Sequence, residues 1–154
     1  MANLRCTIHI ALRQSLFHMK DNPPCFPDGS RGSIVLVIST SGYFGATGVA
    51  GYITSKHAIT GLLRGSQVAG EKYSIRINAV APFMTPTAMV ENFAHEWRTR
   101  EFPVNRPEAV AEIIAILAMD WAQRGACYLV SLWSCLLCFF SLELSLKTAN
   151  NTIE

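Results

Sequence analysis

The spacing of apolar residues changes along the chain, and these changes divide it into helices and strands. Residues 3–20 carry apolar side chains at positions 4, 8, 12 and 16, which share one face of a helix. Residues 33–39 read SIVLVIS, a continuous apolar and β-branched run typical of a strand that is covered on both faces. We therefore expect a helix over 3–20 and a buried strand over 33–39.

The same kinds of segment return further along the chain. Residues 52–70 show helical spacing, and residues 74–82, SIRINAVAP, form a second apolar run that ends at a proline. A further helix is predicted over 108–119, which is entered through Pro107 at a position that tolerates a missing N–H. Strands that alternate with helices are typical of an α/β protein with a parallel sheet.

Composition narrows the class of protein. A chain of 154 residues has the expected size of one compact domain. Thirteen Lys and Arg against eleven Asp and Glu give a net charge of +2 without a basic stripe, so nucleic acid is not an expected partner. Five cysteines without framework spacing favour a reducing compartment, and we expect a cytoplasmic protein. The lone CxxC of Cys135 and Cys138 lacks a second pair of ligands, so we expect no metal site.

One segment offers an alternative to the cytoplasmic location. Residues 125–142 contain no charge, and a run of this length is about the shortest that can span a bilayer as a helix. Membrane association through 125–142 therefore remains open at this point.

Glycines at positions 42, 45, 48 and 51 lie between the strand 33–39 and the helix that follows it. A glycine-rich turn at such a place can hold a pyrophosphate on backbone N–H groups. The dinucleotide fingerprint requires glycines at i, i+2 and i+5, however, and no two of these glycines are two residues apart. The stretch is therefore not predicted to bind phosphate.

The same stretch delivers Tyr52 to the first turn of the helix, with Lys56 four residues later on the same helix face. An ammonium beside a phenol favours the phenolate and lowers its pKa from about 10, which produces an acid or base for catalysis. YxxxK also occurs as an ordinary surface pair, so the pattern alone does not decide. Ser39 strengthens it, because it ends the predicted strand, where a doubly wound sheet carries its functional groups.

These residues resemble the pattern of the short-chain dehydrogenase/reductase family, a serine followed after thirteen residues by YxxxK. The segments GSIVLVIS, GYITSKHAITGLLR and IRINAVAP are similar to those of the family in order and spacing, over about residues 3–129. The resemblance implies a partial doubly wound, Rossmann-like parallel sheet that corresponds to the C-terminal half of the family fold. It also implies hydride transfer between NAD or NADP and a small alcohol or ketone.

The resemblance gives each residue a role. Tyr52 would exchange a proton with the substrate oxygen, Ser39 would hold that oxygen, and Lys56 would bind the nicotinamide ribose and lower the tyrosine pKa. Asn3 is similar to the asparagine that completes the family's tetrad and would support a proton-relay water. In the family, helices that match 3–20 and 50–70 pair subunits, which implies a homo-oligomer.

The loop after the second strand also resembles the family. The family motif P-G-x-x-x-T meets the nicotinamide carboxamide, and this chain reads PFMTPT over 82–87. Pro82, Thr85 and Thr87 are therefore implied to bind the cofactor together with Tyr52 and Lys56. Phe83 replaces the glycine, which puts the backbone path of the loop in question.

Two departures from the family lead to two hypotheses. The first strand and the turn G-x-x-x-G-x-G do not occur in this sequence, and residues 131–154 resemble nothing in the family. We expect a truncated catalytic region over 1–130 that is inactive alone, and an apolar tail over 131–154. The tail is either membrane-associated or translated intron, since Val130 and Ser131 can be encoded by a splice-donor sequence. The alternative is a non-catalytic fragment that acts as a tail-anchored or oligomerising interaction protein.

Overall fold

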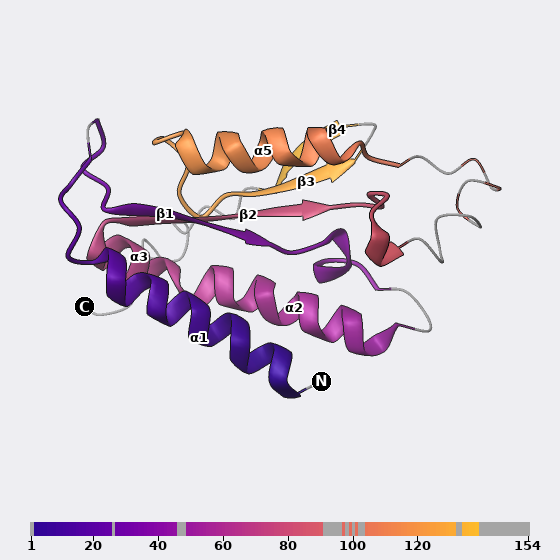
Figure 1. The fold of residues 1–154 in the computed structure, drawn as a ribbon, viewed down its shortest axis with the longest axis horizontal. Helices are drawn as coiled ribbons and strands as arrows, with labels where there is room; N and C mark the ends of the chain where they lie inside the picture. The colour runs from indigo at the N-terminus through magenta and orange to yellow at the C-terminus, as the bar shows by residue number, and fades with distance from the viewer. Residues whose placement is uncertain are drawn as a thin grey trace, which may run out of the picture.

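A computed structural model describes residues 2–25, 27–45, 49–90, 97, 99, 101, 104–131 and 134–138. Within them, one sheet has the strand order β1-β2-β3-β4 (Figure 1). Strands β1 (Gly32–Val37), β2 (Ile75–Pro82) and β3 (Cys127–Ser131) are parallel, and β4 (Ser134–Cys138) is antiparallel to β3. The predicted α/β class with a parallel, partly Rossmann-like sheet is therefore confirmed.

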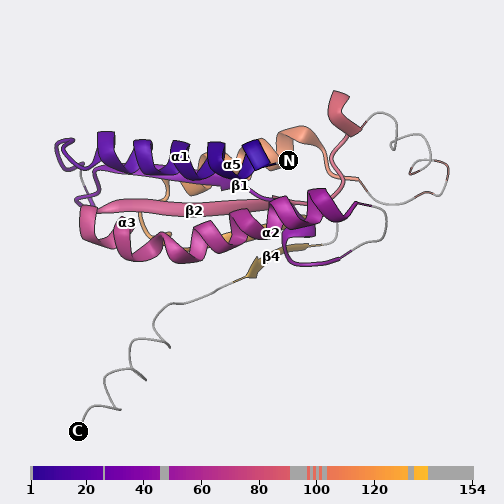
Figure 2. The same cartoon turned by 90° about the horizontal axis from the view of Figure 1, so that it is seen from below.

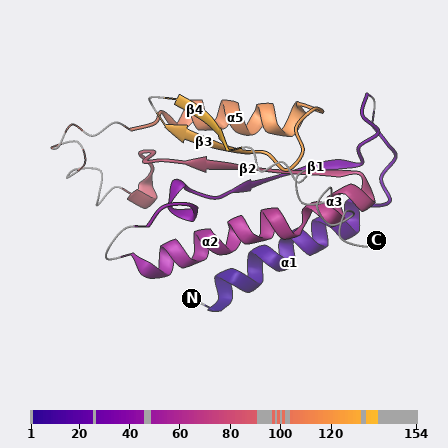
Figure 3. The same cartoon turned by 180° about the vertical axis from the view of Figure 1, so that it is seen from behind.

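Helices cover both faces of the sheet. Helices α1 (Ala2–Met19), α2 (Ala50–Gly65) and α3 (Gln67–Tyr73) lie on one face, and α5 (Pro107–Met119) lies on the other (Figure 3). Figure 2 shows α1 and α2 side by side beneath the sheet. Two short 3-10 turns, η1 (Thr40–Gly42) and η2 (Ala88–Val90), follow β1 and β2 at the carboxyl end of the sheet.

The two-residue period of the strands accounts for the two layers. In β2, Ile77 and Ala79 pack in the core beneath α1 and α2, whereas Val80 packs in the core beneath α5. The side chains of β3 alternate in the same way: Leu129 packs in the core beneath α1 and α2, and Val130 packs in the core beneath α5. Because both faces of β2 are buried, most of its residues are apolar, as the run 74–82 predicted.

Two predicted boundaries were wrong. The helix expected over 52–70 is two helices, because Ser66 lies between α2 and α3 as a turn residue. The break brings α3 close to β2, where a Cβ on Gly70 would lie 2.8 Å from the carbonyl oxygen of Ile75. The first strand ends at Val37, so Ser39 lies two residues beyond it.

Within the apolar run 125–142, residues 127–131 and 134–138 form strands and not the helix that a membrane span requires. Strands β3 and β4 pair as a hairpin, with Ser131 opposite Ser134 and Cys127 opposite Cys138. Within the part of the chain that the structure describes, every helix is too short or too polar to cross a bilayer. The remainder of the tail, 132–133 and 139–154, lies outside the described residues.

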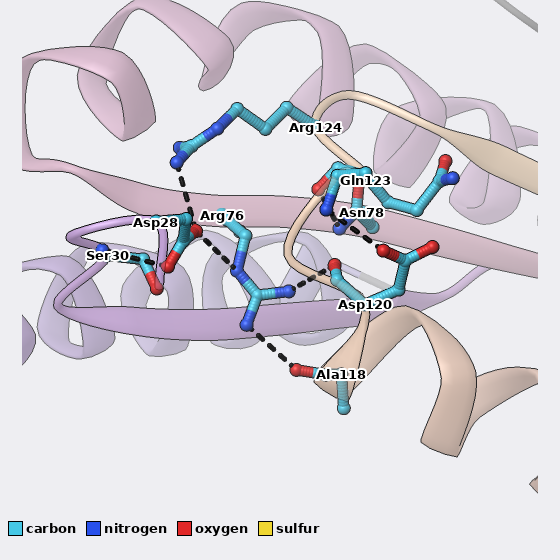
Figure 4. Close-up of polar contacts among 9 residues, drawn as sticks. Asp28, Ser30, Arg76, Asn78, Ala118, Asp120, Gln123 and Arg124 are labelled. Carbon is cyan, nitrogen blue, oxygen red and sulfur yellow. Dashed lines mark hydrogen bonds and ion pairs between the residues drawn. The ribbon is translucent and has the colours of Figure 1, made fainter. Parts of the chain in front are cut away.

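A charge network lies at the start of β2, at the amino end of the sheet (Figure 4). Arg76 of β2 donates to the carbonyl oxygens of Asp120, at 2.6 Å, and Ala118, at 3.0 Å. Its Nε atom lies 3.4 Å from Oδ2 of Asp28, and Arg124 contacts the same oxygen at 3.1 Å. The network therefore ties the loop before β1 to the end of α5 and to β2.

Asn78, also in β2, fixes the start of β3 (Figure 4). Its Nδ2 donates to the carbonyl of Gln123 at 2.9 Å, and its Oδ1 accepts from the N–H of Ala126 at 3.0 Å. Since Asn78 is fully buried, both bonds replace contacts with water that folding removes.

Candidate functional site

Ser39 lies at the carboxyl end of the sheet and is buried. The N–H of Ile38 still donates to Val80 across 2.8 Å, and Ser39 itself is extended, with φ 179° and ψ 158°. Its Oγ accepts from the N–H of Ser41 at 3.2 Å and so caps η1. Ser39 thus continues the direction of β1 and then turns the chain toward α2.

Packing around Gly42 explains why one of the glycines between β1 and α2 is needed. The hydroxyl of Thr60 lies 3.2 Å from the carbonyl oxygens of both Gly42 and Lys56, so η1 sits directly on α2. A Cβ on Gly42 would lie 2.6 Å from Cγ2 of Ile38 and 3.0 Å from the backbone oxygen of Lys56. A glycine is therefore required for packing, whereas Gly45 has open space around it.

Tyr52 and Lys56 lie together on α2, as their spacing predicts. The ammonium of Lys56 is 5.6 Å from the centroid of the Tyr52 ring. The same ammonium donates to the carbonyl oxygen of Val37 at 3.3 Å, which attaches it to the end of β1, two residues before Ser39. Burial lowers the pKa of Lys56, because a less solvated site disfavours the charged amine. Tyr52 keeps 43% of its surface exposed.

Asn3 falls in the first turn of α1, and its side chain lies outside the described part of the structure. The start of α1 and the start of α2 lie at the same end of the molecule (Figure 1). The assignment of Asn3 as a fourth site residue therefore stays a prediction.

The loop that follows β2 lies beside the end of β3. The N–H of Phe83 donates to Val130 at 2.9 Å, so the residue in place of the family's glycine still has strand-like pairing. Its ring packs edge-on against Trp97, with centroids 5.7 Å apart. Of the two threonines, Thr85 donates to the carbonyl of Phe83 at 3.0 Å, and Thr87 is exposed.

Asn105 is a residue that the sequence pattern did not reveal. It is buried just before α5, its N–H donates to Met84 at 2.7 Å, and its Nδ2 donates to Val130 at 2.8 Å. Its Nδ2 also lies 3.4 Å from Oγ1 of Thr85. No local signal marks it, because its partners lie about twenty positions away on both sides in the sequence.

Comparisons with known proteins identify the family of this chain. The family model for short chain dehydrogenase matches residues 2–98. Cyclohexanol dehydrogenase from Acinetobacter sp. (strain SE19) is 30% identical over 131 residues, which cover 82% of this chain and 52% of that protein. A 3-oxoacyl-[acyl-carrier-protein] reductase from Thermotoga maritima is 38% identical over 97 residues, or 58% of this chain and 39% of that protein. The chain thus spans about half or less of the length of these curated relatives.

Solved structures share the fold. The 3-hydroxyacyl-CoA dehydrogenase type-2 from Mycobacterium avium superposes with a TM-score of 0.67 at 23% identity, over 78% of this chain and 49% of that one. ElxO with NADP bound superposes with a TM-score of 0.62 at 26% identity, over 79% of this chain and 51% of that one. From the family match over more than half of its length, we conclude that the chain belongs to the short-chain dehydrogenase family.

Proposed function

We propose that Ser39, Tyr52 and Lys56 carry the chemistry of a nicotinamide-dependent oxidation of a small alcohol, or of the reverse reduction of a ketone. One observation carries this proposal most directly. The ammonium of Lys56 bonds to the carbonyl at the end of β1 while it lies 5.6 Å from the ring centroid of Tyr52. This bond attaches Lys56, and with it Tyr52, two residues before Ser39 at the carboxyl end of the sheet, where doubly wound folds bind ligands.

Each side chain has a defined task in the proposed reaction. The Ser39 hydroxyl hydrogen-bonds to the substrate oxygen, and the Tyr52 phenol takes the proton of the alcohol, or returns it to the ketone. The Lys56 ammonium binds the ribose hydroxyls next to the nicotinamide and keeps positive charge beside the phenol. Asn3 is proposed to hold a water that carries the proton to solvent. The bound nicotinamide would accept the hydride from the carbinol carbon, so that alcohol and oxidised cofactor give ketone, reduced cofactor and a proton.

The residues present fit only one end of a dinucleotide. Lys56 is a donor for the ribose, and Pro82, Thr85 and Thr87 form the loop proposed to meet the nicotinamide. The 154 residues contain no glycine pattern for the pyrophosphate. Two or three hydrogen bonds at about 0.5–3 kcal/mol each, against an association cost of at least ~4 kcal/mol, give about millimolar affinity at best. We therefore propose that cofactor affinity limits this chain for both NAD and NADP, so that it is inactive at ordinary cofactor concentrations and transfers hydride only when the cofactor is supplied at high millimolar concentration.

Apolar side chains around Ser39 support an apolar substrate. Because β1 pairs with β2 in the register Val37 to Val80, the extended Ser39 comes level with Pro82 on the next strand. Phe83 follows at once, and it keeps 37% of its surface exposed while it packs on Trp97. A ring alcohol can lie against this surface, in keeping with the cyclohexanol of one relative's name.

A homo-oligomer through α1 and α2 remains part of the proposal. Ile10 and Phe17 of α1 are large apolar side chains that stay exposed in the single chain. Burial of such residues against a second copy removes apolar surface from water. Light scattering after size-exclusion chromatography tests this, since a monomer at all concentrations would contradict it.

The reaction is tested with cyclohexanol that carries deuterium on its carbinol carbon. The folded chain is incubated with NAD or NADP at about 20 mM, above the millimolar dissociation constant that is the tightest binding expected. Mass spectrometry then measures deuterium in the reduced cofactor. Transfer above the protein-free control supports the proposal, and its absence for ring, linear and branched alcohols with both cofactors would contradict it.

A further inference from the structure

Among the residues that the structure describes, two asparagines are almost completely buried, and they fix opposite ends of the same strand. Asn78 holds the start of β3 through Ala126. Asn105, which is 4% exposed, holds the end of β3 through the carbonyl of Val130. Both side chains use hydrogen bonds that would cost free energy if they were lost inside the protein. Only Asn105 lies at the end that carries Ser39 and Lys56.

The bonds of Asn105 converge on the loop after β2. The carbonyl oxygen of Val130 accepts both the Nδ2 group of Asn105 and the N–H of Phe83. At the next residue of the loop, the backbone of Asn105 donates to the carbonyl of Met84 at 2.7 Å. Asn105, about twenty positions later in the chain, therefore holds the loop at Met84 directly and shares with Phe83 the acceptor on Val130.

Thr85 is the third partner. The hydroxyl of Thr85 donates to the carbonyl oxygen of Phe83 at 3.0 Å. The side-chain nitrogen of Asn105 lies 3.4 Å from the hydroxyl oxygen of Thr85. A hydroxyl has one hydrogen and two lone pairs. With the hydrogen directed to the backbone and one lone pair toward Asn105, the remaining lone pair can accept a hydrogen bond from a primary amide such as the nicotinamide carboxamide.

We propose that Asn105 is the positioning residue for the loop 83–87, and that it orients Thr85 as the acceptor for the carboxamide. This proposal rests on the proposed function, because it concerns how that cofactor is held. Asn105 acts through Thr85 and Met84 and not by contact with substrate. Loss of its amide leaves the carbonyl of Val130 with one donor fewer and releases the loop while the sheet stays intact.

Asn78→Ala is a matched control for Asn105→Ala. The same residue type is removed from another buried place that holds β3, but at the end of that strand distant from Ser39. A general loss of stability affects both variants alike. An effect on the loop and on the cofactor should appear in Asn105→Ala only.

The first measurement is amide hydrogen exchange by NMR and does not depend on catalysis. In Asn105→Ala we expect the exchange of the Phe83 amide to accelerate about tenfold more than that of the Ala126 amide. In Asn78→Ala the order should reverse, because Ala126 loses its acceptor. Equal acceleration at both amides in Asn105→Ala would overturn the proposal. If that variant does not fold, Asn105→Ser, which retains one donor, is measured against the same prediction.

The second measurement is the dependence of deuterium transfer on cofactor concentration. Asn105→Ala should raise the cofactor KM by about tenfold and leave kcat within about twofold. Asn78→Ala should change neither. Equal KM values in the two variants would show that Asn105 has only a structural role. If wild-type protein transfers no deuterium at all, the proposed function fails, and the exchange data still decide whether Asn105 holds the loop.

Discussion

The hydroxyl of Thr60 in α2 lies 3.2 Å from the carbonyl oxygen of Gly42, which joins the turn after β1 to the helix that carries Tyr52 and Lys56. Because of this contact, the position of the turn that contains Ser39 relative to α2 depends on the close approach of Gly42 to Thr60. The contact also explains why residue 42 is a glycine, although the stretch 42–51 lacks the phosphate-binding motif.

Gly42→Ala should therefore destabilise the protein and displace η1. The new methyl would lie 2.6 Å from Ile38 and 3.0 Å from the backbone of Lys56, and backbone atoms cannot move aside easily. Overpacking of this kind costs about 1–3 kcal/mol. Thermal unfolding measures the loss. Gly45→Ala is the control, because nothing lies within 4 Å of its Cβ, and an equal loss in both variants would disprove the packing argument.

Lys56→Ala should reduce both cofactor affinity and the maximal rate of deuterium transfer. Its ammonium is proposed to bind the ribose and also to keep charge beside Tyr52, so one substitution removes both interactions. Lys72→Ala is the control, since Lys72 lies 5.5 Å over the ring of Tyr73 in a similar pair at the distant end of α3. If Lys56→Ala altered only one of the two parameters, the dual role would be wrong.

Asp28 should make the stability of the protein depend on pH in acid. Burial raises the pKa of Asp28, but hydrogen bonds from Ser30 and the charges of Arg76 and Arg124 outweigh it, so the pKa lies below its ordinary value of 3.8. The unfolded chain therefore binds the proton more readily than the folded chain. The contribution of the carboxylate is complete above the unfolded pKa and declines as pH falls through the lower, folded value.

Asp28→Asn should accordingly lower the free energy of unfolding by about 3 kcal/mol at neutral pH, because it leaves Arg76 buried without a countercharge. The difference from wild type should shrink below about pH 4. Denaturant titrations at pH 7, 5 and 3 measure it. Asp21→Asn, in an exposed pair with Lys20, should have almost no effect at any pH.

Cofactor affinity provides a separate test of the nicotinamide-end model. Calorimetry with NAD and with NADP on the folded chain should give dissociation constants of about millimolar or weaker, because only Lys56 and the loop 82–87 offer contacts. A dissociation constant in the micromolar range would contradict this model, because it would require a pyrophosphate-binding site that the model does not contain.

Sequence periodicity predicted the helices and strands in which the same faces are buried along the whole element. The run 74–82 became β2 because both of its faces are buried, and 3–20 became α1 because its apolar residues keep one helical face. Periodicity could not predict the secondary structure of a segment whose pattern fits both a helix and a strand. The uncharged run 125–142 fits a membrane helix or two apolar strands, and only the pairing of Cys127 with Cys138 and of Val130 with Cys135 distinguishes them.

The site was predicted only as far as its residues lie close in sequence. Tyr52 and Lys56 are four apart on one helix, so their proximity follows from helix geometry. The contacts of Asn105 with Val130 and of Asp28 with Arg76 join distant segments, and no local pattern encodes them. The end of β1 at Val37, before Ser39, depends likewise on the turn that Gly42 and Thr60 close.

The central claim is that the Tyr52 phenol moves the proton during hydride transfer, and comparison of wild type with Tyr52→Phe tests it most directly. Deuterium transfer from labelled cyclohexanol is measured at about 20 mM cofactor, with calorimetry as the check on cofactor binding. The account predicts that Tyr52→Phe lowers transfer at least ~100-fold, to the protein-free background, while cofactor affinity stays within about twofold. Transfer by Tyr52→Phe at the wild-type rate would contradict it.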